Sequence, residues 1–264
     1  MQSFRLCPAP ALRVALLALA LTLLVSGCGT APTQRQPAPD PVQQQAHALG
    51  AAGDHAGAAR LYLQAAASAS GAQQQSLQLL AVDSQIQAND LDRAQRLLDE
   101  MPQPLATAEL QQGFSINSAK LALAGQHPVE ALQLLLQVPE DGPYQAELYR
   151  LRAIAYQQEF RYFLSERERV QLDPLLTDPE AQLENQFAIW ETLNRLTDAE
   201  LQQLRTAPAP DPLSGWMELV ELSRLYLQQP DTLADVTPHW QQRYPGHPAS
   251  DAFIAKLLEH MSLV

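Results

Sequence analysis

Glu218 and Glu221 are the carboxylates whose spacing could support acid/base chemistry. They lie three residues apart in a segment with a helical pattern, so both side chains would share one face. Paired carboxylates can hydrolyse a glycosidic bond when one donates a proton and the other activates water or attacks. Hydrolysis of peptidoglycan or a soluble sugar is therefore an enzymatic alternative, although surface acids commonly fall at this spacing without a catalytic role.

The other residues with catalytic potential form no recognised motif. None of the six histidines belongs to an HExxH sequence, which zinc proteases use. The chain contains no GxSxG nucleophile motif, no glycine-rich phosphate loop and no dinucleotide-binding fingerprint. His55 and His127 fall at expected hairpin turns, where a polar side chain is solvated. We therefore expect a protein that is not an enzyme, without a catalytic residue, metal or cofactor.

Cys28 carries the clearest chemical signal in the chain. It ends the sequence LVSGC, which resembles the lipobox at which bacterial lipoproteins are lipidated and cut. Arg5 and Arg13 precede the apolar stretch 14–25, as in a secretory signal. We therefore expect residues 1–27 to be a lipoprotein signal peptide and Cys28 to be the lipidation site. The alternative is an ordinary signal peptide in which Cys28 has no role.

Lipid on Cys28 would tether the protein to a membrane without a transmembrane span, because several acyl chains hold far more firmly than one. Gly29, rather than aspartate, follows the cysteine. In a bacterium with two membranes, the resemblance implies a lipid anchor on the periplasmic face of the outer membrane. Residues 28–41 are rich in proline and polar residues and have no apolar period, so we expect a flexible tether there.

The composition restricts the partners of the chain. Cys7 and Cys28 are its only cysteines, so we expect no disulfide, thiolate zinc site or cysteine nucleophile in the mature fold. The formal net charge is −12, which repels phosphate, and no basic stripe interleaved with aromatic residues occurs. We therefore exclude nucleic acid as a partner. The acidity favours solubility and attraction to a basic patch on a protein.

Small and large apolar residues recur along the first half of the chain. Alanine, leucine and glutamine dominate, and most of the 20 prolines separate the apolar segments, which favours helices. The period is close to the ~34 residues of tetratricopeptide repeats, in which a small residue lets paired helices approach. The equivalent residues, at spacings of 36 and 37, are Ala58, Leu61 and Tyr62, then Ala94, Leu97 and Leu98, then Ala131, Leu134 and Leu135. The turns before them are expected at Gly53-Asp54, Asn89-Asp90 and Gly125-Gln126.

We therefore predict an all-α fold, a tetratricopeptide-like solenoid of helical hairpins over residues 42–264. Such solenoids hold peptides or proteins on a concave surface. The charged run 166–169, Glu-Arg-Glu-Arg, is interpreted as a solvated face, with an interaction site as the alternative. The predicted repeats span about 42–70, 72–102, 105–138 and a degenerate 143–172, followed by non-repetitive helices over 179–264.

Helix starts are marked in the non-repetitive part. Asp178-Pro179 and Asp211-Pro212 each place a capping carboxylate before a proline at the first helical position, and Thr197 and Glu200 have the spacing of a capping box. Two apolar stripes follow the helical period, and their tryptophans are expected in the core. The stripes are Leu183, Phe187 and Trp190, and Trp216, Leu219, Val220 and Ser223.

The C-terminal sequence HWQQRYPGHPA resembles a signature segment of the penicillin-binding protein activator lipoproteins, the LpoA or LppC family. We interpret its residues as structural, because Tyr244-Pro245 and His247-Pro248 should end one helix and Trp240 should pack on Tyr244. Upstream, Trp216 in PLSGWMEL also matches the family. The signature residues are Trp216, Trp240, Arg243, Tyr244, Pro245, His247 and Pro248.

The resemblance implies a non-enzymatic outer-membrane lipoprotein that activates a class A penicillin-binding protein, a peptidoglycan synthase. Members of the family usually continue into a second domain, which is credited with contacting the synthase. Because this chain ends at Val264, it is a short homologue, a product truncated near the domain boundary, or a protein whose partner supplies the rest. We expect it to be the N-terminal presenting or spacer domain, with the synthase contact made through a domain absent from it. A scaffold lipoprotein for outer-membrane protein assembly is the alternative from another class.

Overall fold

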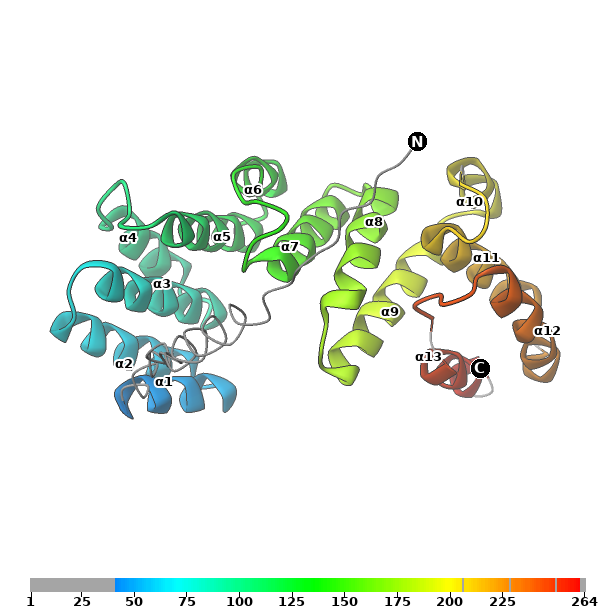
Figure 1. Cartoon of the computed structure of the whole chain (residues 1–264), viewed down its shortest axis with the longest axis horizontal. Helices are drawn as coiled ribbons and strands as arrows, with labels where there is room; N and C mark the ends of the chain where they lie inside the picture. The colour runs from blue at the N-terminus through cyan, green and yellow to red at the C-terminus, as the bar shows by residue number, and fades with distance from the viewer. Residues whose placement is uncertain (1–40, 206, 228, 250, 262–264) are drawn as a thin grey trace, which may run out of the picture. The chain divides into compact units, whose positions relative to one another are not determined.

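The computed structural model describes residues 41–205, 207–227, 229–249 and 251–261, and these residues are helical without a strand (Figure 1). Within them, no helix is both long and apolar enough to cross a membrane. The helices are α1 (Pro41–Ala51), α2 (His55–Ser68), α3 (Gly71–Gln87), α4 (Leu91–Asp99), α5 (Ala108–Ala124), α6 (Pro128–Leu135), α7 (Gln145–Gln158), α8 (Tyr162–Leu172), the 3₁₀ helix η1 (Asp173–Leu175), α9 (Pro179–Leu193), α10 (Asp198–Leu204), α11 (Pro212–Leu225), α12 (Pro230–Arg243) and α13 (Asp251–Met261).

Four helical hairpins follow one another in the first part of the fold: α1–α2, α3–α4, α5–α6 and α7–α8 (Figure 1). Each first helix also packs on the hairpin before it, as α3 does on α2 and α7 on α6. The expected all-α, tetratricopeptide-like architecture is therefore confirmed. Helix α1 begins at Pro41 rather than after it, because the fixed φ of proline suits the first turn of a helix.

The four hairpins share one turn geometry. The second residue after each first helix has a positive φ: 84° at Gly53, 59° at Asn89, 61° at Gln126 and 58° at Phe160. The next amide donates to the carbonyl five residues earlier, as in Asp54 N to Leu49 O at 2.9 Å. This bond is the Schellman closure of a helix C-terminus. The three turns expected from the sequence are confirmed, and the fourth hairpin turns in the same way.

A small residue lies five positions after each turn and sets the packing of the hairpin. Ala58, Ala94, Ala131 and Ser165 are at most 1% exposed. The small side chains let the second helix approach the first, as in helix pairs of repeat proteins. Ser165 fills the position with a hydroxyl, which donates to the carbonyl of Ala153 at 2.9 Å. The repeat register read from the three alanines is therefore confirmed, and the fourth unit keeps it with serine.

Three small apolar clusters lie in turn along the hairpins, and a larger one joins α9 to α13. The larger cluster contains the apolar residues of both predicted stripes, with Trp216 fully buried and Trp190 partly buried, and it also includes the fully buried Trp240. Its helices begin at the expected caps: Asp178 accepts from Ala181 N, Asp211 accepts from Ser214 N, and Thr197 forms the capping box with Glu200. Buried apolar side chains thus hold the C-terminal helices together.

The charged run 166–169 is not a solvated face. Glu166 is 0% exposed, and Glu168 and Arg169 are only partly exposed, so Arg167 alone is open to solvent. Helix α8 packs against both α7 and α9, which leaves it little free surface. Arg169 lies 3.7 Å from Glu166, and Arg152 of α7 lies 3.9 Å from Glu168. The run therefore helps to join three helices.

Candidate functional site

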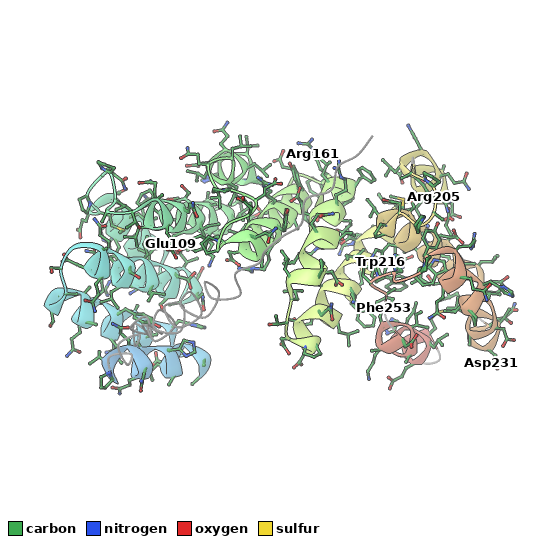
Figure 2. All side chains as sticks on the ribbon, in the orientation of Figure 1. Glu109, Arg161, Arg205, Trp216, Asp231 and Phe253 are labelled. Carbon is green, nitrogen blue, oxygen red and sulfur yellow. The ribbon has the colours of Figure 1, made fainter. Side chains whose placement is uncertain are left out.

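The signature residues come together around His247, which lies in the segment between α12 and α13. Its imidazole centroid is 5.1 Å from the ring of Trp216, 4.7 Å from Trp240 and 6.0 Å from Tyr244, in edge-to-face arrangements. Trp216 also packs edge-on against Phe253 of α13 at 4.9 Å, and Figure 2 shows these two side chains close together beside α11 and α13. We refer to Trp216, Trp240, Tyr244, His247 and Phe253 as the aromatic cluster.

Both ring nitrogens of His247 are occupied by backbone groups. The amide of Ala249 donates to Nδ1 at 3.0 Å, so Nε2 carries the proton and donates to the carbonyl of Pro212 at 2.7 Å. Burial lowers the pKa of His247 to about 4, and the nearby Pro212 carbonyl and Asp211 carboxylate offset only part of that effect. A neutral imidazole with both nitrogens engaged fastens the segment to α11 and is not free for proton transfer.

Local sequence dictates how His247 reaches this position. Tyr244 accepts a bond from His247 N at 3.2 Å across Pro245 and Gly246, and Gly246 has a φ of 72°. Proline and glycine at these positions are typical of a type II turn, which needs a positive φ at its third residue. The turn ends α12, as expected for Tyr244-Pro245, and folds His247 back over the tryptophans.

Trp240 and Tyr244 lie on one face of α12 and its end, with ring centroids 5.6 Å apart, which confirms their predicted packing. The indole Nε1 of Trp240 donates to the carbonyl of Gly215 at 3.1 Å. A buried indole normally needs such an acceptor. The bond therefore ties α12 to α11 at the same level as His247.

Glu218 binds two of the signature residues, Tyr244 and Arg243. The hydroxyl of Tyr244 donates to Oε2 of Glu218 at 2.9 Å, Arg243 forms an ion pair with its Oε1, and Arg205 lies 3.9 Å away. Glu221 binds Arg205 at 2.7 Å. The two carboxylates that the sequence offers as an acid/base pair are thus held by guanidinium groups, and this arrangement joins α10, α11 and α12.

Pro248 connects the signature segment to α9 through buried amides that the sequence reading missed. Gln186 Nε2 donates to the carbonyl of Pro248 at 2.8 Å and lies 3.3 Å from Oδ2 of Asp173. Asn185 donates to Oδ1 of the same aspartate at 3.2 Å. Burial raises the pKa of Asp173, and the amide bonds offset part of the rise. The pair Asn185-Gln186 beside an apolar stripe was the available sequence signal.

The remaining candidate residues do not converge on a reactive centre. Within the described residues, no group of three or more histidine, cysteine, aspartate or glutamate side chains could hold a metal ion. A hollow of about 610 Å³ lies between α8 and the start of α11, and each of its three acids has a partner: Glu140 lies 2.6 Å and Glu168 3.9 Å from Arg152, and Asp211 caps a helix. The predicted lipidation site Cys28, the predicted signal peptide 1–27 and nearly all of the predicted tether 28–41 lie outside the described residues.

A family model described as "LppC putative lipoprotein" matches residues 54–263, which include every helix of the aromatic cluster. The chain belongs to the LppC family. Curated relatives of this LppC-family chain are named penicillin-binding protein activator LpoA. That of Edwardsiella ictaluri is 32% identical over 242 residues, covering 89% of this chain and 33% of its own, and that of Vibrio cholerae is 28% identical, covering 88% and 37%. The chain thus spans about a third of their length.

Solved structures share the fold of this LppC-family chain. The amino-terminal domain of Escherichia coli LpoA superposes with a TM-score of 0.66 at 22% identity, covering 76% of this chain and 90% of that domain. The N-terminal domain of Haemophilus influenzae LpoA gives 0.64 at 22% identity, covering 76% and 93%. Full-length LpoA from Haemophilus influenzae gives 0.63 at 21% identity, but only 36% of it is covered. The present helices therefore correspond to an amino-terminal domain fold.

Proposed function

We propose that this chain is the helical domain of an activator of a class A penicillin-binding protein. The family match over residues 54–263 supports the proposal, because the matching relatives are named as activators of penicillin-binding proteins. The domain acts as a presenting arm and does not catalyse a reaction. It holds a further domain of the activator in a fixed orientation, and that further domain contacts the synthase.

One observation supports the presenting role: the contacts of the signature residues join helices to one another. Both ring nitrogens of His247 form hydrogen bonds with backbone groups, one in α11 and one in the segment between α12 and α13. Glu218 binds both Tyr244 and Arg243. Such contacts make the C-terminal helices rigid, and rigid helices fix the orientation of a following domain. A catalytic site would instead leave a nucleophile, acid or base facing a cavity.

The anchor forms the second part of the proposal. Lipid on Cys28, after removal of signal peptide 1–27, attaches the protein to the periplasmic side of the outer membrane, and residues 28–41 form the tether. The family description as a lipoprotein supports an envelope location. Replacement of Cys28 by alanine should leave an uncut precursor without lipid, measured by radiolabelled palmitate incorporation and a mobility shift. Label on the Cys28→Ala protein equal to that of the unchanged chain would disprove the assignment.

A synthase assay tests the presenting role. The purified chain is added to a class A penicillin-binding protein with lipid II, and polymerisation and cross-linking are followed. A second sample carries the chain fused at its C-terminus to the remaining two thirds of the Edwardsiella ictaluri relative. We expect stimulation by the fusion alone. Full stimulation by the unfused chain would disprove the presenting role and place the activating surface on these helices.

The aromatic cluster provides a control for this assay. The variant Trp240→Phe removes the indole bond to Gly215 but keeps an aromatic ring. In the fusion, the substitution should reduce stimulation of the synthase only to the extent that it loosens the last helices. Hydrogen exchange of α11 and α12 measures this loosening. Loss of stimulation without any change in exchange would contradict the view that Trp240 acts by keeping the last helices rigid.

A further inference from the structure

Phe160 stands in a position that folding alone does not explain. It occupies the left-handed turn between α7 and α8, with a φ of 58°, where the other hairpins have Gly53, Asn89 and Gln126. A bulky side chain is strained in this region of backbone space, whereas glycine and asparagine adopt it readily. The ring is also 78% exposed, so burial of apolar surface does not offset the cost of the backbone strain. Backbone strain of this kind is concentrated at ligand-binding and other functional sites.

A hollow of about 360 Å³ opens directly beside Phe160. Its walls come from the start of α8, with Tyr162 and Leu164, from the segment between α9 and α10, with Leu196, and from the end of α10, with Leu204. The Phe160 ring meets Tyr162 edge-on at 6.4 Å between centroids. The hollow is therefore a recess with both apolar and polar walls, large enough to receive a side chain, and an aromatic ring stands at its edge.

The rim of the recess is basic. Arg161 and Arg195 are both exposed, and within the described chain neither guanidinium lies within 4.0 Å of a carboxylate. Figure 2 places Arg161 at the outer end of the α7–α8 pair, and its guanidinium lies 5.2 Å above the ring of Tyr156. Glu200 also lines the recess and keeps its negative charge, because Thr197 binds it in the capping box through neutral groups, so the two arginines leave the rim with a net positive charge. The chain as a whole has a charge of −12, so this basic rim is locally opposite to the rest.

We propose that the Phe160 patch, formed by Phe160, Arg161, Tyr162, Leu164, Arg195 and Leu196, binds an acidic peptide segment of a partner protein that inserts an apolar side chain into the recess. Carboxylates of the segment pair with Arg161 and Arg195, while the anchor side chain packs against Phe160 and Tyr162. The recess favours a peptide over a lipid surface, because a membrane requires apolar groups that protrude together. This interaction is separate from the activator role proposed above and does not depend on it.

Fluorescence anisotropy with a defined probe tests the proposal. The probe is a fluorescein-labelled Asp-Glu-Leu-Phe-Glu-Asp peptide, compared with Lys-Lys-Leu-Phe-Lys-Lys and Asp-Glu-Gly-Gly-Glu-Asp. We expect saturable binding of the first peptide to the purified full chain, at least tenfold weaker binding of the other two, and weakening with added salt. Absence of saturable binding, or equal binding of the basic peptide, would overturn the proposal.

Variants separate binding from folding. Phe160→Asn restores a residue suited to the turn, so its melting midpoint should equal or exceed that of the unchanged chain while peptide affinity falls at least tenfold. A lowered midpoint with unchanged affinity would overturn the proposal and assign Phe160 a structural role. Arg161→Glu with Arg195→Glu should weaken binding at least tenfold, whereas the exposed Arg96→Glu on α4 should not change it.

Two further measurements examine other occupants. Sedimentation with phosphatidylglycerol vesicles tests a lipid surface, and sedimentation velocity of the chain alone tests a second copy. We expect neither vesicle binding nor self-association that depends on Phe160. If Phe160→Asn abolished vesicle binding or dimer formation and left peptide binding unchanged, the peptide proposal would be wrong and that other occupant would take its place.

Discussion

Gly215 of α11 lies directly beneath the imidazole of His247. A β-carbon at position 215 would come within 2.5 Å of His247 Cδ2 and 3.0 Å of Tyr244 Cδ1. The carbonyl of the same glycine accepts the indole bond of Trp240. The absence of a side chain at this one position therefore lets α11, α12 and the turn after it approach closely enough for the aromatic cluster to form.

The close approach predicts that Gly215→Ala is destabilising. The added methyl group must displace a ring that is held by two hydrogen bonds, and overpacking of this kind costs about 1–3 kcal/mol. Urea unfolding measures the loss. Gly50→Ala in α1 is the matched control, because its β-carbon would meet only Ala58 Cβ at 3.8 Å, and it should be neutral or stabilise by about 0.4–1 kcal/mol. Equal effects of both substitutions would contradict the packing described.

The buried, neutral imidazole of His247 leads us to expect that the free energy of unfolding falls in mild acid. Its folded-state pKa of about 4 lies below the ordinary value of 6.5, so the unfolded chain binds a proton first. The stabilisation is complete above pH 6.5 and is lost as the pH falls from 6.5 toward 4. The loss is roughly 2–3 kcal/mol over this window. Urea unfolding of His247→Gln should show a lower stability at pH 7 and a flatter pH dependence in this window, whereas the exposed His239→Gln should keep the original slope. Parallel slopes for all three proteins would contradict the prediction.

Features set by neighbouring residues were predictable from the sequence. Asp211 and Thr197 cap helices because their side chains meet amides within the same turn, and the positions of Ala58, Ala94 and Ala131 follow from the repeat period. The aromatic cluster was predictable only in part. The sequence indicated that Trp240 packs on Tyr244, but not that His247 reaches Trp216, since that contact depends on how α11 and α12 pack.

The errors occurred where a third helix changes the surroundings. Glu166 reads as a surface residue because its neighbours along the chain are charged, but α9 covers the face of α8 from which it projects. The left-handed backbone of Phe160 was not predictable, since the sequence contains no glycine or asparagine at that turn. Both residues depart from what local preference favours, and only the packed helices show it.

The repeat register predicts a large cost for a charge at Ala94. This residue is 0% exposed between α4 and its neighbours, so Ala94→Arg forces a long, charged side chain into a packed contact. Overpacking and burial of an unpaired charge should together cost at least about 3 kcal/mol. Circular-dichroism melts measure the midpoint. Gln95→Arg, at the adjacent exposed position, should leave it nearly unchanged, and an unchanged midpoint for Ala94→Arg would show that the register is wrong.

Glu166 predicts the opposite pH dependence to that of His247. Its side chain is fully buried, Arg169 approaches to 3.7 Å, and within the described chain neither carboxylate oxygen has a well-aligned hydrogen-bond donor. Burial raises the pKa of Glu166 to about 8, against the opposing effects of Arg169, of the nearby Ser165 and Thr192 hydroxyls and, more weakly, of Arg195. The folded chain therefore keeps this carboxyl protonated at pH values where the unfolded chain has released the proton.

The sign follows from proton binding. Because the folded-state pKa is above the ordinary value of 4.5, the stabilisation is complete below pH 4.5 and is lost as the pH rises toward 8. Glu166→Gln stays neutral at every pH, so its stability should match that of the unchanged chain near pH 5 and exceed it by roughly 3 kcal/mol at pH 8.5. Urea unfolding at the two pH values measures the difference. The exposed Glu191→Gln on α9 should show no such divergence, and if Glu166→Gln also shows none, the carboxyl is ionised in the folded chain and Arg169 compensates its charge.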